Sequence, residues 1–75
     1  MDFELNKGII KKNVEGNIYP WILKDFETGA EFEMSNDAMK IHGMNEGDIV
    51  EFSGSIQGDT TYLAISQIEV RMNLN

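Results

Sequence analysis

The sequence predicts an all-β fold, in which five antiparallel strands form one small barrel within a single domain of 75 residues. Apolar and polar residues alternate along five short segments, which is the periodicity of strands that bury one face. Clusters of Gly, Asn and Asp separate these segments, as tight turns require. Residues 35–41 have the composition of a helix start, so we expect one short helical element there.

The first three predicted strands form a meander at residues 3–12, 18–24 and 30–34, joined by turns at residues 13–17 and 25–29. Gly8 interrupts the first strand and indicates a bulge or a sharp bend there. In the third strand, Phe32 and Met34 share one side and are expected in the core, because strand side chains alternate. Glu31 and Glu33 then point to the other side.

The second half of the chain predicts the helical element and a final hairpin. Residues 35–37 (SND) form a cap before a short helical turn between the third and fourth strands. The last two strands are expected at residues 48–56 and 61–70, with a turn at residues 57–60 and a tail at about residues 71–75. Side chains expected to point inward or to fill one barrel end are Met39, Met44, Val50, Phe52 and Ile56. A three-stranded meander followed by a hairpin is how a five-stranded OB barrel is built.

The charge balance is acidic, with a formal net charge of −7 from six Lys and Arg against thirteen Asp and Glu. Because phosphate contacts dominate non-specific nucleic-acid affinity, this balance counts against a general polyanion binder. Four of the six cations nevertheless lie in the first third of the chain: Lys7, Lys11, Lys12 and Lys24. Gathered on one face, these lysines could still contact phosphates.

Other function classes find little support. The chain has no cysteine and one histidine, His42 in a loop, so we expect no disulfide, metal site or cofactor. No nucleophile has a base at a recognisable spacing, and Glu31 and Glu33 are expected to be solvated, so we expect no enzyme. No apolar run is long enough to cross a membrane and the first residues do not resemble a signal peptide, so we expect a soluble, cytoplasmic protein.

The stretch at residues 17–23 (NIYPWIL) holds the only tryptophan and the only proline. Strand alternation places one set of side chains on each face: Tyr19, Trp21 and Leu23 on one, and Ile18, Pro20 and Ile22 on the other. We expect the second set to feed the core and the first to carry two aromatic rings outward. Pro20 has no N–H for the sheet, which indicates a bulge or an unpaired position in this strand.

These segments resemble a cold-shock domain, a compact OB fold that binds single-stranded RNA or DNA, over residues 7–70. Residues 7–12 (KGIIKK) resemble the opening T-G-x-V-K-W-F strand of that family. Residues 19–22 (YPWI) lie where the family has F-G-F-I, and residues 37–39 (DAM) where it has S-A-I. Residues 46–52 (EGDIVEF) closely match its E-G-Q-x-V-x-F.

The departures from the family pattern fall on its binding positions. Lys12 stands in place of the strand-one tryptophan, and Asn13 in place of the phenylalanine after it. The second family motif, V-F-V-H-F, lies over residues 32–36 (FEMSN), so that Glu33, Ser35 and Asn36 replace the platform residues. A second register keeps Phe32 on the platform but buries Glu33. We prefer the first, because an unpaired buried carboxylate is very costly.

The resemblance implies weak binding of single-stranded RNA or DNA, with bases stacked on Tyr19 and Trp21. Each stacked base contributes about 1–3 kcal/mol. The lysines expected to meet phosphates or to extend that cationic edge are Lys11, Lys12, Lys7 and Lys24. The alternative is a protein-interaction module or a homo-oligomer that has lost nucleic-acid binding, because aromatic residues are also favoured at protein interfaces. Simple packing of the two rings is a third interpretation.

Overall fold

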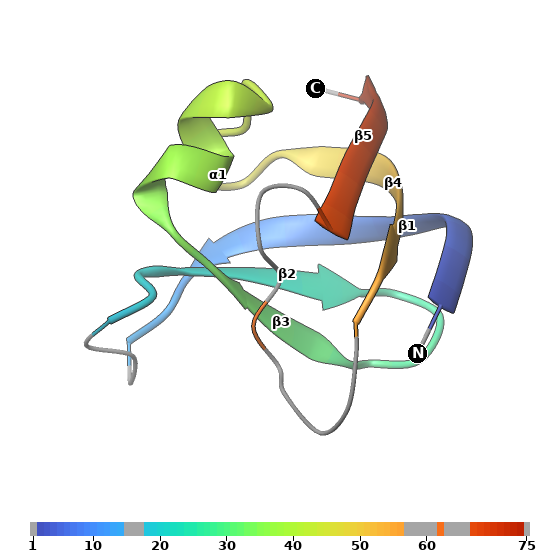
Figure 1. The fold of residues 1–75 in the computed structure, drawn as a ribbon, viewed down its shortest axis with the longest axis horizontal. Helices are drawn as coiled ribbons and strands as arrows, with labels where there is room; N and C mark the ends of the chain where they lie inside the picture. Colours follow the sequence, from blue (N-terminus) through green and yellow to red (C-terminus); the bar gives the residue numbers. More distant parts are fainter. Residues whose placement is uncertain (1, 15–17, 57–61, 63–66, 75) are drawn as a thin grey trace.

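The computed structural model describes residues 2–14, 18–56, 62 and 67–74 (Figure 1). The elements are β1 (Asp2–Lys12), β2 (Trp21–Asp25), β3 (Glu31–Met34), α1 (Asn36–Ile41), β4 (Ile49–Ser55) and β5 (Ile68–Asn73). The five strands form one sheet in the order β3-β2-β1-β4-β5, and all neighbouring strands are antiparallel. The predictions of a mostly β fold and of one short helix between the third and fourth strands are therefore confirmed.

Two predicted boundaries were wrong by three residues each. The second strand begins at Trp21 rather than at residue 18, because Pro20 has no N–H with which to extend the ladder to β1. There the backbone N–H of Asn13 donates to the carbonyl of Pro20 at 2.8 Å, and its side-chain amide donates to the carbonyl of Tyr19 at 2.9 Å. At the other end of the chain, β5 runs through Asn73, so residues 71–73 belong to the sheet and not to a tail.

Some predicted features lie outside the described residues. These are part of the turn at residues 13–17, the turn at residues 57–60 and most of the first half of the predicted strand at residues 61–70. Tyr62 is described, and it forms an isolated parallel bridge with Glu33 of β3. This bridge brings the chain between β4 and β5 to the outer edge of β3.

The core lies on one face of the sheet and is closed at one end by α1 (Figure 1). In the sheet register Leu23 stands opposite Ile10 on one side and Phe32 on the other, and all three are buried. The remaining members of this buried cluster are Met34, Ala38, Met39, Met44, Val50, Phe52, Ile56 and Ile68. Every side chain predicted to point inward from the third and fourth strands and from the helical region is thus in the core.

The predicted irregularity of the first strand occurs at a different place. The register between β1 and β4 shifts between Phe3 and Asn6, where Leu5 has a φ of 49°. Gly8 has another role, because a Cβ atom there would lie 2.6 Å from the carbonyl oxygen of Lys24. The glycine lets β1 and β2 approach each other closely.

A buried carboxylate organises the turn after β2. Asp25 is fully buried, and its carboxylate accepts hydrogen bonds from the side-chain amide of Asn6 at 2.8 Å and from the backbone N–H of Glu27 at 2.9 Å. The hydroxyl of Thr28 donates to it at 3.1 Å. These donors compensate the lost hydration of the carboxylate and tie the turn to the first half of β1.

Candidate nucleic-acid interface

Trp21 lies on the core side of the sheet, which corrects the expectation that its ring faces outward. It pairs with Met34 of β3, which is buried, and it packs against the core cluster. Leu23, two residues further on, is in the core itself. The sequence interpretation placed Ile22 in the core and Trp21 outside, and the opposite assignment of the two faces moves every side chain of the strand to the other side.

Ile22 occupies the outer face instead. It stands opposite Lys11 of β1 and Glu33 of β3, yet only 7% of its surface is exposed. We attribute this burial to the aliphatic parts of the long side chains beside it. The preferred register of the third strand is also confirmed, because Phe32 is in the core and Glu33 lies on this outer face.

The indole of Trp21 is half-buried and is held by the start of α1. Its Nε1–H donates to the side-chain Oδ1 of Asn36 at 2.7 Å. Asn36 is the first residue of α1 and is exposed. The hydroxyl of Ser35 caps this helix by accepting from the N–H of Ala38, so the cap that the sequence predicted also places Asn36 beside the tryptophan.

Tyr19 stacks on a second tyrosine. The rings of Tyr19 and Tyr62 have centroids 4.1 Å apart and planes 20° from parallel. Tyr19 lies between β1 and β2, and Tyr62 between β4 and β5. Sequence reasoning missed Tyr62, which fell inside a predicted strand. The only signal in the sequence was its residue type, because the chain has two tyrosines and the other is Tyr19.

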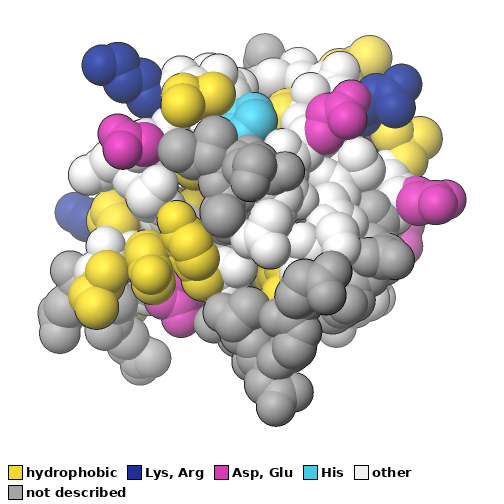
Figure 2. All heavy atoms as spheres, in the orientation of Figure 1, with side chains coloured by type: hydrophobic (Ala, Val, Ile, Leu, Met, Phe, Trp, Pro, Cys, Tyr) yellow, Lys and Arg dark blue, Asp and Glu magenta, His cyan; other side chains and the backbone are white. Residues whose placement is uncertain are grey.

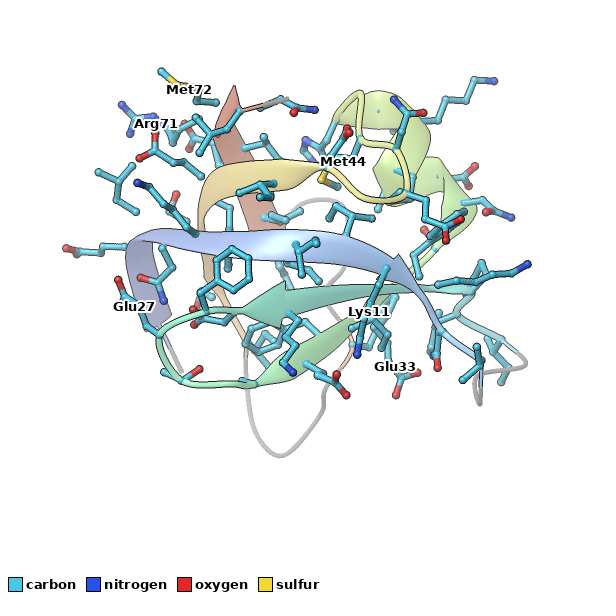
Figure 3. The ribbon with its side chains drawn as sticks, turned by 180° about the vertical axis from the view of Figure 1, so that it is seen from behind. Lys11, Glu27, Glu33, Met44, Arg71 and Met72 are labelled. Atoms are coloured by element: carbon cyan, nitrogen blue, oxygen red, sulfur yellow. The ribbon has the colours of Figure 1, made fainter. Side chains whose placement is uncertain are left out.

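The predicted lysines do not gather in one place. Lys12 is exposed and pairs directly with Trp21 in the register of β1 and β2. Lys11 points to the outer face, where its Nζ lies 2.6 Å from a carboxylate oxygen of Glu31. Figure 3 shows Lys11 extending from β1 across β2 toward β3. Lys24 pairs with Glu31 in the register, and Lys7 lies further back along β1, opposite Glu51 of β4.

The outer-face lysines are already partnered by charge. The hydrogen bond from Lys11 lowers the pKa of Glu31 below its ordinary value of 4.5, and the positive charges of Lys11 and Lys24 act in the same direction. The carboxylate therefore stays ionised beside these two lysines. Of the six predicted binding residues, Lys12 and Trp21 are direct register partners, and Tyr19 lies two residues before Trp21 in the chain.

We call this part of the molecule the aromatic end; it comprises Lys12, Tyr19, Trp21, Asn36 and Tyr62. It lies at the left of Figure 1, where β1 ends, β2 begins and the chain passes from β3 to α1. Figure 2 shows hydrophobic side chains gathered over the same region. Two further apolar residues of the β1–β2 connection are strongly exposed, Val14 at 90% and Ile18 at 78%.

The described residues meet the requirements of neither a metal site nor a membrane-spanning helix. Among the described residues, no three His, Cys, Asp or Glu side chains are grouped so that they could hold a metal ion. His42 is the C-terminal cap of α1 and donates its backbone N–H to the carbonyl of Ala38. No helix in the described part of the chain is long and apolar enough to cross a membrane.

Comparison of the chain with known protein families, with curated proteins and with solved structures finds no match.

Proposed function

We propose that this protein binds single-stranded RNA or DNA weakly at the aromatic end. In this proposal bases stack on the rings of Tyr19, Trp21 and Tyr62, and Lys12 contacts a phosphate. The observation that carries it is the pairing of Lys12 with Trp21, which sets a cation beside an aromatic ring at the end of two strands. Aromatic side chains flanked by positive charge are the usual means of binding single strands without sequence preference.

The topology supports the same proposal. In an OB barrel, ligands bind over the second and third strands, flanked by the loops between strands one and two and between strands four and five. Tyr19 and Tyr62 come from those two connections, and their rings stack beside the start of β2. We propose that the sheet is that of an OB barrel of cold-shock type, and the bridge between Glu33 and Tyr62 supports this closure.

The charge distribution sets the expected strength. Lys11 and Lys24 lie beside Glu31, so the outer face does not present a row of free cations. A net charge of −7 repels a polyanion and leaves few positions for phosphate contact. We therefore propose a weak, cytoplasmic binding protein without catalytic activity, whose affinity comes mainly from stacking.

Two single substitutions test the site. Tyr19→Ala removes one stacking ring and should weaken binding of a short single-stranded oligonucleotide by about 1–3 kcal/mol. Lys12→Ala should weaken it and reduce its salt dependence. The matched control is Lys11→Ala on the next residue, whose side chain pairs with Glu31 on the other face. Equal affinity of the Tyr19→Ala variant and the wild-type protein, with both folded, would show that the site is wrong.

A second candidate is a contact with another protein or with a second copy of the chain. The strong exposure of Val14 and Ile18 at the aromatic end favours it, because large exposed apolar side chains in one region are typical of interaction sites. Size measurements of the free protein and of an Ile18→Ser variant test it. A dimer that dissociates on this substitution would favour self-association over nucleic-acid binding.

A further inference from the structure

The hydrogen bond between Trp21 and Asn36 determines which hydrogen-bonding groups of Asn36 are left for a base. The indole Nε1–H is only a donor, so the atom of Asn36 that it contacts at 2.7 Å must be the side-chain oxygen. The amide nitrogen Nδ2 then has two N–H groups, which have no hydrogen-bond partner among the described residues. Asn36 is exposed, so these donors are accessible to a ligand.

We propose that Asn36 selects keto bases, which are uracil, thymine and guanine, over the amino bases cytosine and adenine. This inference rests on the proposed function, since it needs a base stacked beside Trp21. At position 4 of a pyrimidine or position 6 of a purine, uracil, thymine and guanine carry an oxygen that accepts a hydrogen bond, whereas cytosine and adenine carry there an amino group that donates one. An amide that presents N–H groups pairs with the first kind and opposes the second.

The tryptophan is what creates this preference. A free asparagine presents both an acceptor and a donor, and it commonly pairs with adenine through both at once. Here the oxygen is already bound to the indole, so the two-point contact with adenine competes with an existing hydrogen bond. Single-stranded bases are read on their exposed edges by such side-chain groups while their faces stack on aromatic rings.

Asn36→Asp is the variant that isolates the effect. The aspartate keeps an oxygen for the Trp21 indole and replaces the two N–H donors with a second acceptor. An acidic residue is also favourable in the first turn of a helix, so the fold of α1 should be retained. The added charge lowers affinity for every oligonucleotide, but it lowers it equally for two ligands with the same backbone, so the ratio of affinities reports the base preference.

The experiment measures binding of four homopolymers to the wild-type protein and to Asn36→Asp. Oligodeoxyuridine is compared with oligodeoxycytidine, and oligoinosine with oligoadenosine, because the bases of each pair have the same ring system. We expect the wild-type protein to prefer uracil and hypoxanthine by roughly 2- to 10-fold, the range that one hydrogen bond provides. We expect Asn36→Asp to abolish or reverse both preferences, with an unchanged circular dichroism spectrum.

The outcomes separate this inference from the function on which it rests. Binding of all four ligands with ratios that Asn36→Asp leaves unchanged would overturn the role of Asn36 and keep the stacking site. A preference for cytosine and adenine in the wild-type protein would also overturn it. If the wild-type protein binds none of the four homopolymers, the proposed function itself is overturned, and the inference with it.

Discussion

Trp21 of β2 and Met34 of β3 are direct partners in the antiparallel register, and both lie on the face of the sheet that carries the core. Met34 is completely buried, whereas Trp21 stands at the start of its strand and is only half-buried. The indole thus spans the boundary between core and solvent. Any ligand of the aromatic end would contact a ring whose position the core has already fixed, which lowers the entropy lost on binding.

The close approach of β1 and β2 at Gly8 can be tested by Gly8→Ala. The added Cβ would lie 2.6 Å from a backbone oxygen and 2.9 Å from a methyl group of Leu23, so the strands must move apart. We expect a loss of about 1–3 kcal/mol in the free energy of unfolding, measured by urea denaturation. The comparison is Gly29→Ala, where nothing lies within 4 Å and the cost arises only from a φ of 75°. A smaller loss for Gly8→Ala than for Gly29→Ala would contradict this packing.

The buried carboxylate of Asp25 is expected to be a strong contributor to stability. Asp25→Ala leaves the side-chain amide of Asn6 and the backbone N–H of Glu27 without their acceptor. The Asn6 amide is buried, and a buried donor left unpaired costs about 1–3 kcal/mol. The midpoint temperature of thermal unfolding of Asp25→Ala should therefore be well below that of Asp37→Ala, a variant that removes an exposed carboxylate of α1. Similar midpoints for the two variants would show that the Asp25 hydrogen bonds are weak.

The ion pair between Lys11 and Glu31 should make a small contribution that depends on pH. The pKa of Glu31 is lowered in the folded protein, so the ionised carboxylate stabilises the fold at pH values above its ordinary pKa of 4.5. That contribution is lost as the pH falls through the lowered value. Because both side chains are 45% exposed, we expect Glu31→Gln to cost at most about 1 kcal/mol at neutral pH, and less at high salt.

The control for this ion pair is Glu69→Gln, which changes an exposed acid of β5. Urea unfolding of both variants and of the wild-type protein is compared at neutral pH and at a pH below the folded-state pKa of Glu31. The difference between Glu31→Gln and the wild type should disappear at the lower pH. A difference that persists there would show that the substitution acts through packing and not through charge.

Much of the fold could be predicted from the sequence, because strand alternation and turn residues are local signals. Phe32 and Met34 alternate with two glutamates, and this pattern alone placed them in the core. The cap at Ser35 could also be predicted, because a hydroxyl just before a helix accepts a hydrogen bond from a backbone N–H of the first turn, here that of Ala38. Residues 71–73 were missed because nothing local distinguishes the end of a polar edge strand from a tail.

The candidate site was less predictable, because it depends on register and on contacts between distant segments. Whether Trp21 faces the core is decided by which residue of β3 it opposes, and a shift of one residue reverses the answer. The stacking of Tyr19 on Tyr62 joins residues 43 positions apart in the chain, as their numbers show. Strand alternation alone predicts that Lys11 and Lys12 lie on opposite faces of the sheet. Which of the two lies beside Trp21 is known only from the pairing of β1 with β2.

The most direct test of nucleic-acid binding at the aromatic end is a titration of Trp21 fluorescence with a short single-stranded oligonucleotide at low and at moderate salt. Trp21 is the only tryptophan, so the signal reports on that end of the molecule. We predict saturable quenching that weakens with salt, with a slope of about −0.7 in log affinity against log salt for a single phosphate contact, and a loss of this slope in Lys12→Ala. No change in fluorescence at high micromolar oligonucleotide would contradict the account.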